Sequence, residues 1–155
     1  MKLSFVIALL LTFSQGALAM SMFDAGKVCV FSAVQAKLSL NGKPLKNVKV
    51  TREWHWKKKR SDETVTDENG YFSLPSVYER SISQYLPAEI AISQKMSVWI
   101  NGEETEFWIN AKDDGKENSE YGGEPIALSC ELSREKVLIE KYGSLLLTMC
   151  KKGIE

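Results

Sequence analysis

Aromatic and basic side chains are concentrated in one short segment, which reads REWHWKKKR from position 52 to 60. Aromatic rings beside several cations can stack on a ring or hold phosphate groups, as glycan- and nucleic-acid-binding surfaces do. Successive residues of a strand point to opposite faces, and Val48, Val50, Trp54 and Trp56 all have even numbers. This alternation favours another arrangement, in which these four side chains point into a core while the lysines lie in solvent at a hairpin tip. If the function is recognition, this exposed tip remains the best place for a partner to bind. The candidate partner-binding residues are Trp54, His55, Trp56, Lys57, Lys58, Lys59 and Arg60.

Catalytic groups are scarce. His55 is the only histidine, and it has the parity opposite to that of the tryptophans, so we expect it to be an exposed surface residue. The sequence contains no nucleophile elbow, phosphate loop or zinc-protease helix motif. We therefore expect no catalytic residue and no cofactor, and the chain is interpreted as a non-enzyme.

A run of acidic residues surrounds Gly115. Asp113, Asp114, Glu117 and Glu120 suggest calcium by type, but they lack the ordered alternation of a calcium-binding loop. The cysteines are too dispersed to form a zinc site with the single histidine. We expect residues 112–123 to form a solvated loop and the chain to hold no metal.

The N-terminus has the features of a secretory signal peptide. Lys2 precedes an apolar run from Leu3 to Phe13, and Ala17-Leu18-Ala19 has the small residues of a cleavage site. The run of about a dozen residues is shorter than the ~20 that a membrane-spanning helix needs. We predict that residues 1–19 are removed, and that residues 20–155 form a single domain in the periplasm or outside the cell, without a transmembrane segment. Twenty basic and twenty acidic residues balance, which gives no support for nucleic acid as a partner.

Three cysteines follow the predicted cleavage site. In an oxidising compartment they predict one disulfide and one free thiol. We favour Cys130 with Cys150 because both fall in a predicted C-terminal pair of strands. Cys29 with either of them, or three separate buried thiols, remain open alternatives.

Alternating apolar residues and turn dipeptides predict strands along most of the chain. Residues 28–40 form a long first strand with a bend near Ser32, and Asn41-Gly42 and Asn101-Gly102 mark tight turns. Residues 57–63 form a charged hairpin tip, while 76–86 is a helical turn or a loop, and 135–142 is a strand or a helix. The fold class is therefore all-β, a single antiparallel β-sandwich of about seven or eight strands with at most one short helix.

The stretch from Leu38 to Leu74 resembles a known class of module. NGKPLKNVKV at 41–50 and TDENGYF at 66–72 are similar to the carboxypeptidase regulatory-like and transthyretin-like β-sandwich modules, and the rest of the chain resembles a small family of secreted bacterial proteins built on them. The resemblance implies an accessory or binding role. It argues against the transthyretin-like hydrolases, which use several histidines and a Tyr-Arg-Gly-Ser motif. The corresponding residues Tyr142-Gly143-Ser144 lack the arginine.

The leading functional hypothesis is an exported protein-binding module whose partner is a protein in the periplasm or outside the cell. A sharper form is an immunity or inhibitor protein against a toxin delivered to the periplasm. The alternative is a carbohydrate or cell-wall binding module that uses Trp54, Trp56, Trp99 or Trp108. A transthyretin-like hydrolase is disfavoured.

Overall fold

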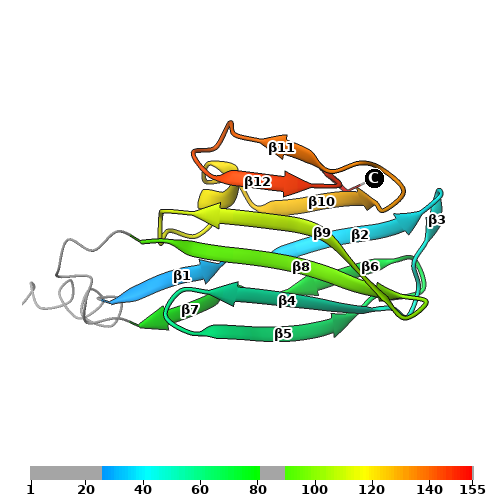
Figure 1. Cartoon of the computed structure of the whole chain (residues 1–155), viewed down its shortest axis with the longest axis horizontal. Helices are drawn as coiled ribbons and strands as arrows, with labels where there is room; N and C mark the ends of the chain where they lie inside the picture. The colour runs from blue at the N-terminus through cyan, green and yellow to red at the C-terminus, as the bar shows by residue number, and fades with distance from the viewer. Residues whose placement is uncertain (1–25, 81–89, 155) are drawn as a thin grey trace, which may run out of the picture.

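The computed structural model describes residues 26–80 and 90–154 of the chain. The predicted signal peptide (1–19) and the second half of the 76–86 segment lie outside these residues. The fold class is confirmed: β-sheets pack against each other around one core, and the only helical element in the described residues is the short 3-10 turn η2 (Ser119–Tyr121) (Figure 1). No helix within the described residues has the length and apolar character needed to span a membrane.

The first sheet joins segments from both ends of the chain. Its strands are β13 (Cys150–Lys152), β10 (Ile126–Glu131) and β2 (Val34–Leu40), followed by β3 (Lys43–Pro44) and β6 (Tyr71–Leu74), which both pair with β2. β2 and β10 run parallel, with Leu38 opposite Cys130. The other pairs between described strands are antiparallel, as expected.

The first long strand bends where the sequence predicts it. β1 (Lys27–Phe31) ends just before Ser32, and it pairs with β7 (Val77–Arg80) in a small two-stranded sheet. At the bend, the backbone N–H of Ala33 donates to Ser76 Oγ at 2.9 Å. The start of the 76–86 segment is therefore a strand, not a helical turn or loop, because β1 supplies a hydrogen-bonding edge for it.

The second sheet carries the surface of interest. Its strands, in spatial order, are β11 (Val137–Ile139), β12 (Leu145–Thr148), β9 (Glu103–Lys112), β8 (Ile92–Ile100), β4 (Lys49–His55) and β5 (Lys59–Val65). One detail differs from the sequence-based expectation. The return strand β5 begins already at Lys59, opposite His55, so the hairpin tip contains only residues 56–58. The 135–142 segment contains the short strand β11, which confirms the strand among the two expected alternatives, because β12 offers it a pairing edge.

Alternating residues of the two sheets fill the core. Val34, Ala36 and Leu38 of β2 are fully buried, and Phe72 of β6 meets Phe107 of β9 edge to face with ring centroids 6.4 Å apart. Complete burial of an aliphatic or aromatic side chain contributes about 1.5–3 kcal/mol each. The period-2 pattern thus turns one face of each sheet inward and leaves the other to solvent.

Turn residues adopt the backbone conformations that their types favour. Asn41-Gly42 and Asn101-Gly102 all have positive φ, which matches the right-handed twist of the strands they join. Gly70 also has positive φ, and a Cβ atom there would lie 2.4 Å from the carbonyl oxygen of Leu38. Glycine is therefore required at position 70 for space as well as for conformation.

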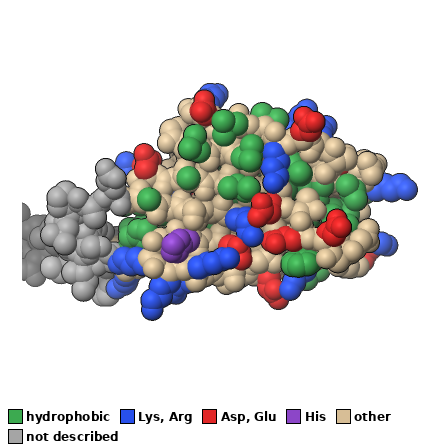
Figure 2. All heavy atoms as spheres, in the orientation of Figure 1, with side chains coloured by type: hydrophobic (Ala, Val, Ile, Leu, Met, Phe, Trp, Pro, Cys, Tyr) green, Lys and Arg blue, Asp and Glu red, His purple; other side chains and the backbone are tan. Residues whose placement is uncertain are grey.

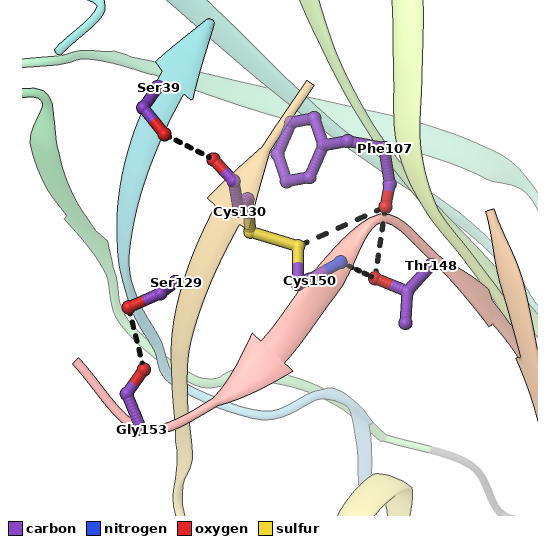
Figure 3. The surroundings of a disulfide bond; sticks show 7 residues. All are labelled: Ser39, Phe107, Ser129, Cys130, Thr148, Cys150 and Gly153. Carbon is purple, nitrogen blue, oxygen red and sulfur yellow. Dashed lines mark hydrogen bonds between the residues drawn. A yellow bond between two sulfur atoms is a disulfide. The ribbon is translucent and has the colours of Figure 1, made fainter. Parts of the chain in front are cut away.

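A disulfide closes the C-terminal part of the first sheet. Cys130 and Cys150 lie directly opposite each other on β10 and β13 and are bonded, the pairing favoured from the sequence (Figure 3). The backbone N–H of Cys150 donates to Thr148 Oγ1 at 3.0 Å, and that hydroxyl donates to the carbonyl of Phe107. The disulfide therefore ties β13 to β10 while Thr148 ties the preceding residues to β9. Cys29 is a free, buried thiol.

Candidate protein-binding surface

The residues proposed for partner binding divide into buried and exposed groups. Trp54 is only 6% exposed, and its Nε1 donates to Glu79 Oε1 at 2.8 Å, so it serves the core and is removed from the partner-binding set. Trp56 is half-buried, because β4 ends at His55 and Trp56 begins the connection to β5. His55 and the basic residues 57–60 are exposed.

A row of exposed residues crosses the outer face of the second sheet. His55 of β4 lies opposite Ser93 of β8, Ser93 lies opposite Ala111 of β9, and Ala111 lies opposite Leu145 of β12. Residues opposite one another in a ladder share a face of the sheet. The two small side chains, Ser93 and Ala111, therefore separate a histidine on one side from a leucine on the other.

This arrangement produces a groove, here called the His55 groove, with a volume of about 560 Å³. Its lining includes His55, Trp56, Ser93, Ala111 and Leu145. Leu145 is 58% exposed, so it forms an apolar wall that solvent reaches. Figure 2 shows the histidine at the lower left of the molecule, with apolar side chains above it on the same face and basic side chains beside and below it. The groove can receive an apolar side chain of a partner.

Positive charge lies beside the groove at the hairpin tip. The Lys57 ammonium sits 4.7 Å from the centre of the Trp56 ring, and Lys58 is exposed next to it. Lys59 and Arg60 are balanced within the molecule, since they lie 3.2 Å from Glu53 and 3.6 Å from Glu79. The exposed Lys58 therefore adds positive charge at the tip, which favours an acidic group on a partner.

The neighbouring row of the sheet is saturated with ion pairs. Lys95 Nζ lies 3.1 Å from Glu53, 3.1 Å from Glu104 and 3.3 Å from Glu106. Partial burial acts to lower the pKa of Lys95, but hydrogen bonds to these three glutamates outweigh it and raise the pKa above its ordinary value. For Glu53, burial likewise acts to raise the pKa, and the bonds to Lys95 and Lys59 lower it. These charges are paired with one another within the molecule. The His55 groove is therefore the part of this face that is more available to a partner.

A buried polar network lies beneath the same sheet, and the sequence analysis missed it. Glu120 is fully buried, not part of a solvated loop, and its carboxylate accepts hydrogen bonds from Ser32 Oγ at 2.7 Å, Gln94 Nε2 at 2.7 Å and Lys112 Nζ at 3.2 Å. Burial alone would raise the pKa of Glu120, but Lys112, Ser32 and Gln94 outweigh it and lower the pKa. No local signal separates Glu120 from the acidic residues before it, because its partners come from β8, β9 and the bend after β1.

The described residues contain no group of three or more His, Cys, Asp or Glu side chains placed to hold a metal ion. Asp113, Asp114, Glu117 and Glu120 do not form such a group. Asp114 instead accepts from the backbone N–H of Lys116 at 2.7 Å.

The four tryptophans do not form a common platform. Trp108 is fully buried, and Trp54 belongs to the core, so neither can stack on a sugar. Trp99 is 47% exposed at the far end of β8. Six residues separate it from Ser93 at the groove, a distance of roughly 20 Å along a strand. Trp56 and Trp99 therefore cannot contact one short glycan together.

The comparisons with known proteins add a family and no activity. A family model described as "Domain of unknown function (DUF6795)" matches residues 34–135, from β2 to the loop after β10. The match includes the β4–β5 hairpin and most of the His55 groove, and it ends before β11 and β12. No curated protein and no solved structure matches the chain.

Proposed function

The chain belongs to the DUF6795 family, and we propose that it is an exported, non-enzymatic binding module that holds a protein partner in the His55 groove. The groove itself carries the proposal. Small residues on its floor and an exposed leucine on its wall leave apolar surface open to solvent. Contiguous exposed apolar surface is typical of interaction sites. We further propose the relation to carboxypeptidase regulatory-like and transthyretin-like modules, which agrees with a binding role.

The chemistry of the groove defines the partner. An apolar side chain fits between Trp56 and Leu145, and an acidic group beside it faces Lys58. The Trp56 ring is of a type that dominates binding energy in protein interfaces. We expect the partner to present an extended or looped segment with one large apolar and one acidic residue.

Export is part of the proposal. The leader sequence and the Cys130–Cys150 disulfide support an oxidising compartment, in which such a bond persists. The sharper form of the proposal is an inhibitor or immunity protein that blocks a toxin or hydrolase delivered to that compartment. In that case the captured partner loses its activity when this protein is added, and its gene lies next to this one.

The test is capture from the native cell envelope with variants that fill the groove. Ala111→Phe places a ring on the groove floor, and Lys58→Glu reverses the charge at the tip. Thr51→Phe adds the same ring to the same sheet, four residues along β4 from His55, and serves as the matched control. We expect a partner that both wild type and Thr51→Phe bind, with affinity at least about tenfold lower for Ala111→Phe, a loss of about 1.4 kcal/mol. Equal capture by Ala111→Phe would refute the groove as the binding site.

A cell-wall glycan is the second candidate, and Trp56 is the observation that favours it, since half-buried rings in grooves can stack on sugars. Titration of peptidoglycan fragments, followed by tryptophan fluorescence, separates the two. We expect no change in fluorescence. A fluorescence change in wild type that is absent in Ala111→Phe would mean that the groove binds a glycan and not a protein.

A further inference from the structure

The strand β11 is an unprotected edge of the second sheet. It lies at the end of the strand order, beyond β12, and at the top of the view in Figure 1. Its side chains are all apolar, and Val137 and Leu138 are 61% and 53% exposed. An exposed apolar edge is a template for pairing with another strand.

Two other outer edges differ from β11. The charges of β5, at the opposite edge of the same sheet, are already paired within the molecule, Arg52 with Asp62 and Lys49 with Glu63 among them. In the first sheet, β13 carries Lys151 and Lys152, which would repel a second copy of themselves. Among these three edge strands, only β11 consists entirely of apolar residues.

The charges that flank β11 have a symmetry. The segment reads Glu135-Lys136-Val137-Leu138-Ile139-Glu140-Lys141. We propose that β11 pairs with β11 of a second copy of this chain, antiparallel and centred on Leu138, in a twofold-symmetric dimer. With this register Lys136, just before the strand, faces Glu140, just after the strand, of the second copy. A twofold axis repeats this attraction, so two opposite-charge pairs flank the apolar centre.

The apolar residues also match across the axis. Leu138 lies opposite Leu147 of β12 and shares the outer face with it, so the two Leu138 side chains meet on that face. Val137 and Ile139 share the inner side with Thr148 and Leu146, which are buried. Val137 of each copy therefore packs against Ile139 of the other, and the exposed apolar side chains of the edge become covered.

Other arrangements are less favourable. A parallel pairing in register sets Lys136 against Lys136 and Glu140 against Glu140 of the second copy, and like charges directly opposite destabilise a sheet. An antiparallel register centred on Val137 sets Lys136 against Leu138 and Glu135 against Ile139 of the second copy. It exchanges ion pairs for charges that lie against apolar side chains.

The dimer surface is separate from the His55 groove, so this inference does not depend on the proposed function. A strand of three residues makes a small interface, of the weak class below about 1,200 Å². We therefore expect reversible association, and two grooves that face the same side of one continuous sheet.

Sedimentation equilibrium tests the inference over protein concentrations from about 10 μM to about 1 mM, the range of weak protein pairs. We expect the mass of wild type to rise from one chain toward two. Lys136→Glu alone sets the reversed charge against Glu140 of the second copy, and Glu140→Lys alone sets it against Lys136, so each variant should associate at least about tenfold more weakly. An equimolar mixture of the two single variants restores every opposite-charge pair and should form a heterodimer. Lys46→Glu, a charge reversal at an exposed lysine that lies 3.8 Å from Glu68, is the matched control and should associate like wild type.

Three results would overturn the dimer: wild type that stays monomeric throughout the range, single variants that associate like wild type, or a mixture that does not recover. Lys136→Glu also removes an exposed contact within the chain, between Lys136 and Glu106 at 3.8 Å. This contact is absent from the mixture as well, so recovery in the mixture shows that the weaker association of the single variant comes from the contact between the two copies. If wild type is monomeric but captures its partner, the dimer is refuted and the groove proposal is not. If wild type and Ala111→Phe dimerise alike but capture the partner equally well, the groove proposal is refuted and the dimer is not.

Discussion

Replacing the buried carboxylate of Glu120 by an amide, in Glu120→Gln, is expected to lower the free energy of unfolding by about 3–5 kcal/mol. The change keeps the size of the side chain. It leaves the ammonium of Lys112 buried, with its side chain 1% exposed and its countercharge gone. Removing one partner of a buried ion pair is costly for this reason, whereas an exposed pair contributes less than about 1 kcal/mol.

A double variant separates the charge effect from the lost hydrogen bonds. Glu120→Gln with Lys112→Met removes the stranded cation, so more than half of the lost stability should return, since apolar replacement of a whole buried pair is often neutral. Glu104→Gln is the matched control. Its partner Lys95 is closer, at 3.1 Å, but the pair is on the surface, and the loss should stay under about 1 kcal/mol. We expect burial of the ion pair, and not the distance between its charges, to determine which of the two variants loses more stability.

The pH dependence follows from the direction of the Glu120 shift. Its pKa is lowered in the folded state, because Lys112 and the hydrogen bonds from Ser32 and Gln94 outweigh the effect of burial. The unfolded chain therefore binds a proton more readily. The stabilisation is fully present above the unfolded pKa of about 4.3, and it is lost as pH falls through the lower folded pKa. The difference between wild type and Glu120→Gln should shrink below about pH 4.

Urea unfolding followed by tryptophan fluorescence measures these differences, and a loss of 3 kcal/mol corresponds to a melting temperature about 10 °C lower. A loss under about 1 kcal/mol for Glu120→Gln would refute the reasoning, because it is the size expected of a solvated pair. A double variant no more stable than the single one would refute it too. Either result would mean that water reaches Lys112.

Further expectations concern the backbone and the cysteines. Removal of the disulfide by Cys130→Ala with Cys150→Ala should cost about 3 kcal/mol in urea unfolding, from the 20 residues that separate the two cysteines, and an unchanged midpoint would contradict it. Gly102→Ala should cost about 1–2 kcal/mol for its positive φ alone. Gly70→Ala should cost more than this, because its Cβ would clash with a backbone oxygen, and equal melting temperatures for the two variants would show that the turn relaxes. The Cys29 thiol, whose pKa burial raises, should react with a thiol reagent only after unfolding; rapid reaction of the folded protein would show that it is accessible.

Local signals accounted for much of the second sheet. The Asn101-Gly102 dipeptide predicted the β8–β9 hairpin because its residues tolerate positive φ, and both adopt it. Parity predicted that Trp54 is buried. Parity also assigned Trp56 to the core, and there it was only partly right, since alternation loses its meaning where the strand ends at His55.

The candidate site was located in part. The exposed basic tip was predicted, but the groove beside it was not, because it depends on the alignment of His55 with Ser93, Ala111 and Leu145 across four strands. Each of these residues is ordinary in its own segment. Their proximity arises only when the registers of three strand pairs are set together.

The sequence by itself determined the all-β class, the main turns and the alternation of buried and exposed residues, because these depend on steric preferences within a few residues. The tertiary structure decided that β2 pairs in parallel with β10, that Glu120 meets Ser32 across 88 residues, and that β11 is left at an open edge. Such contacts depend on which distant surfaces exclude water together, and no local pattern records that choice.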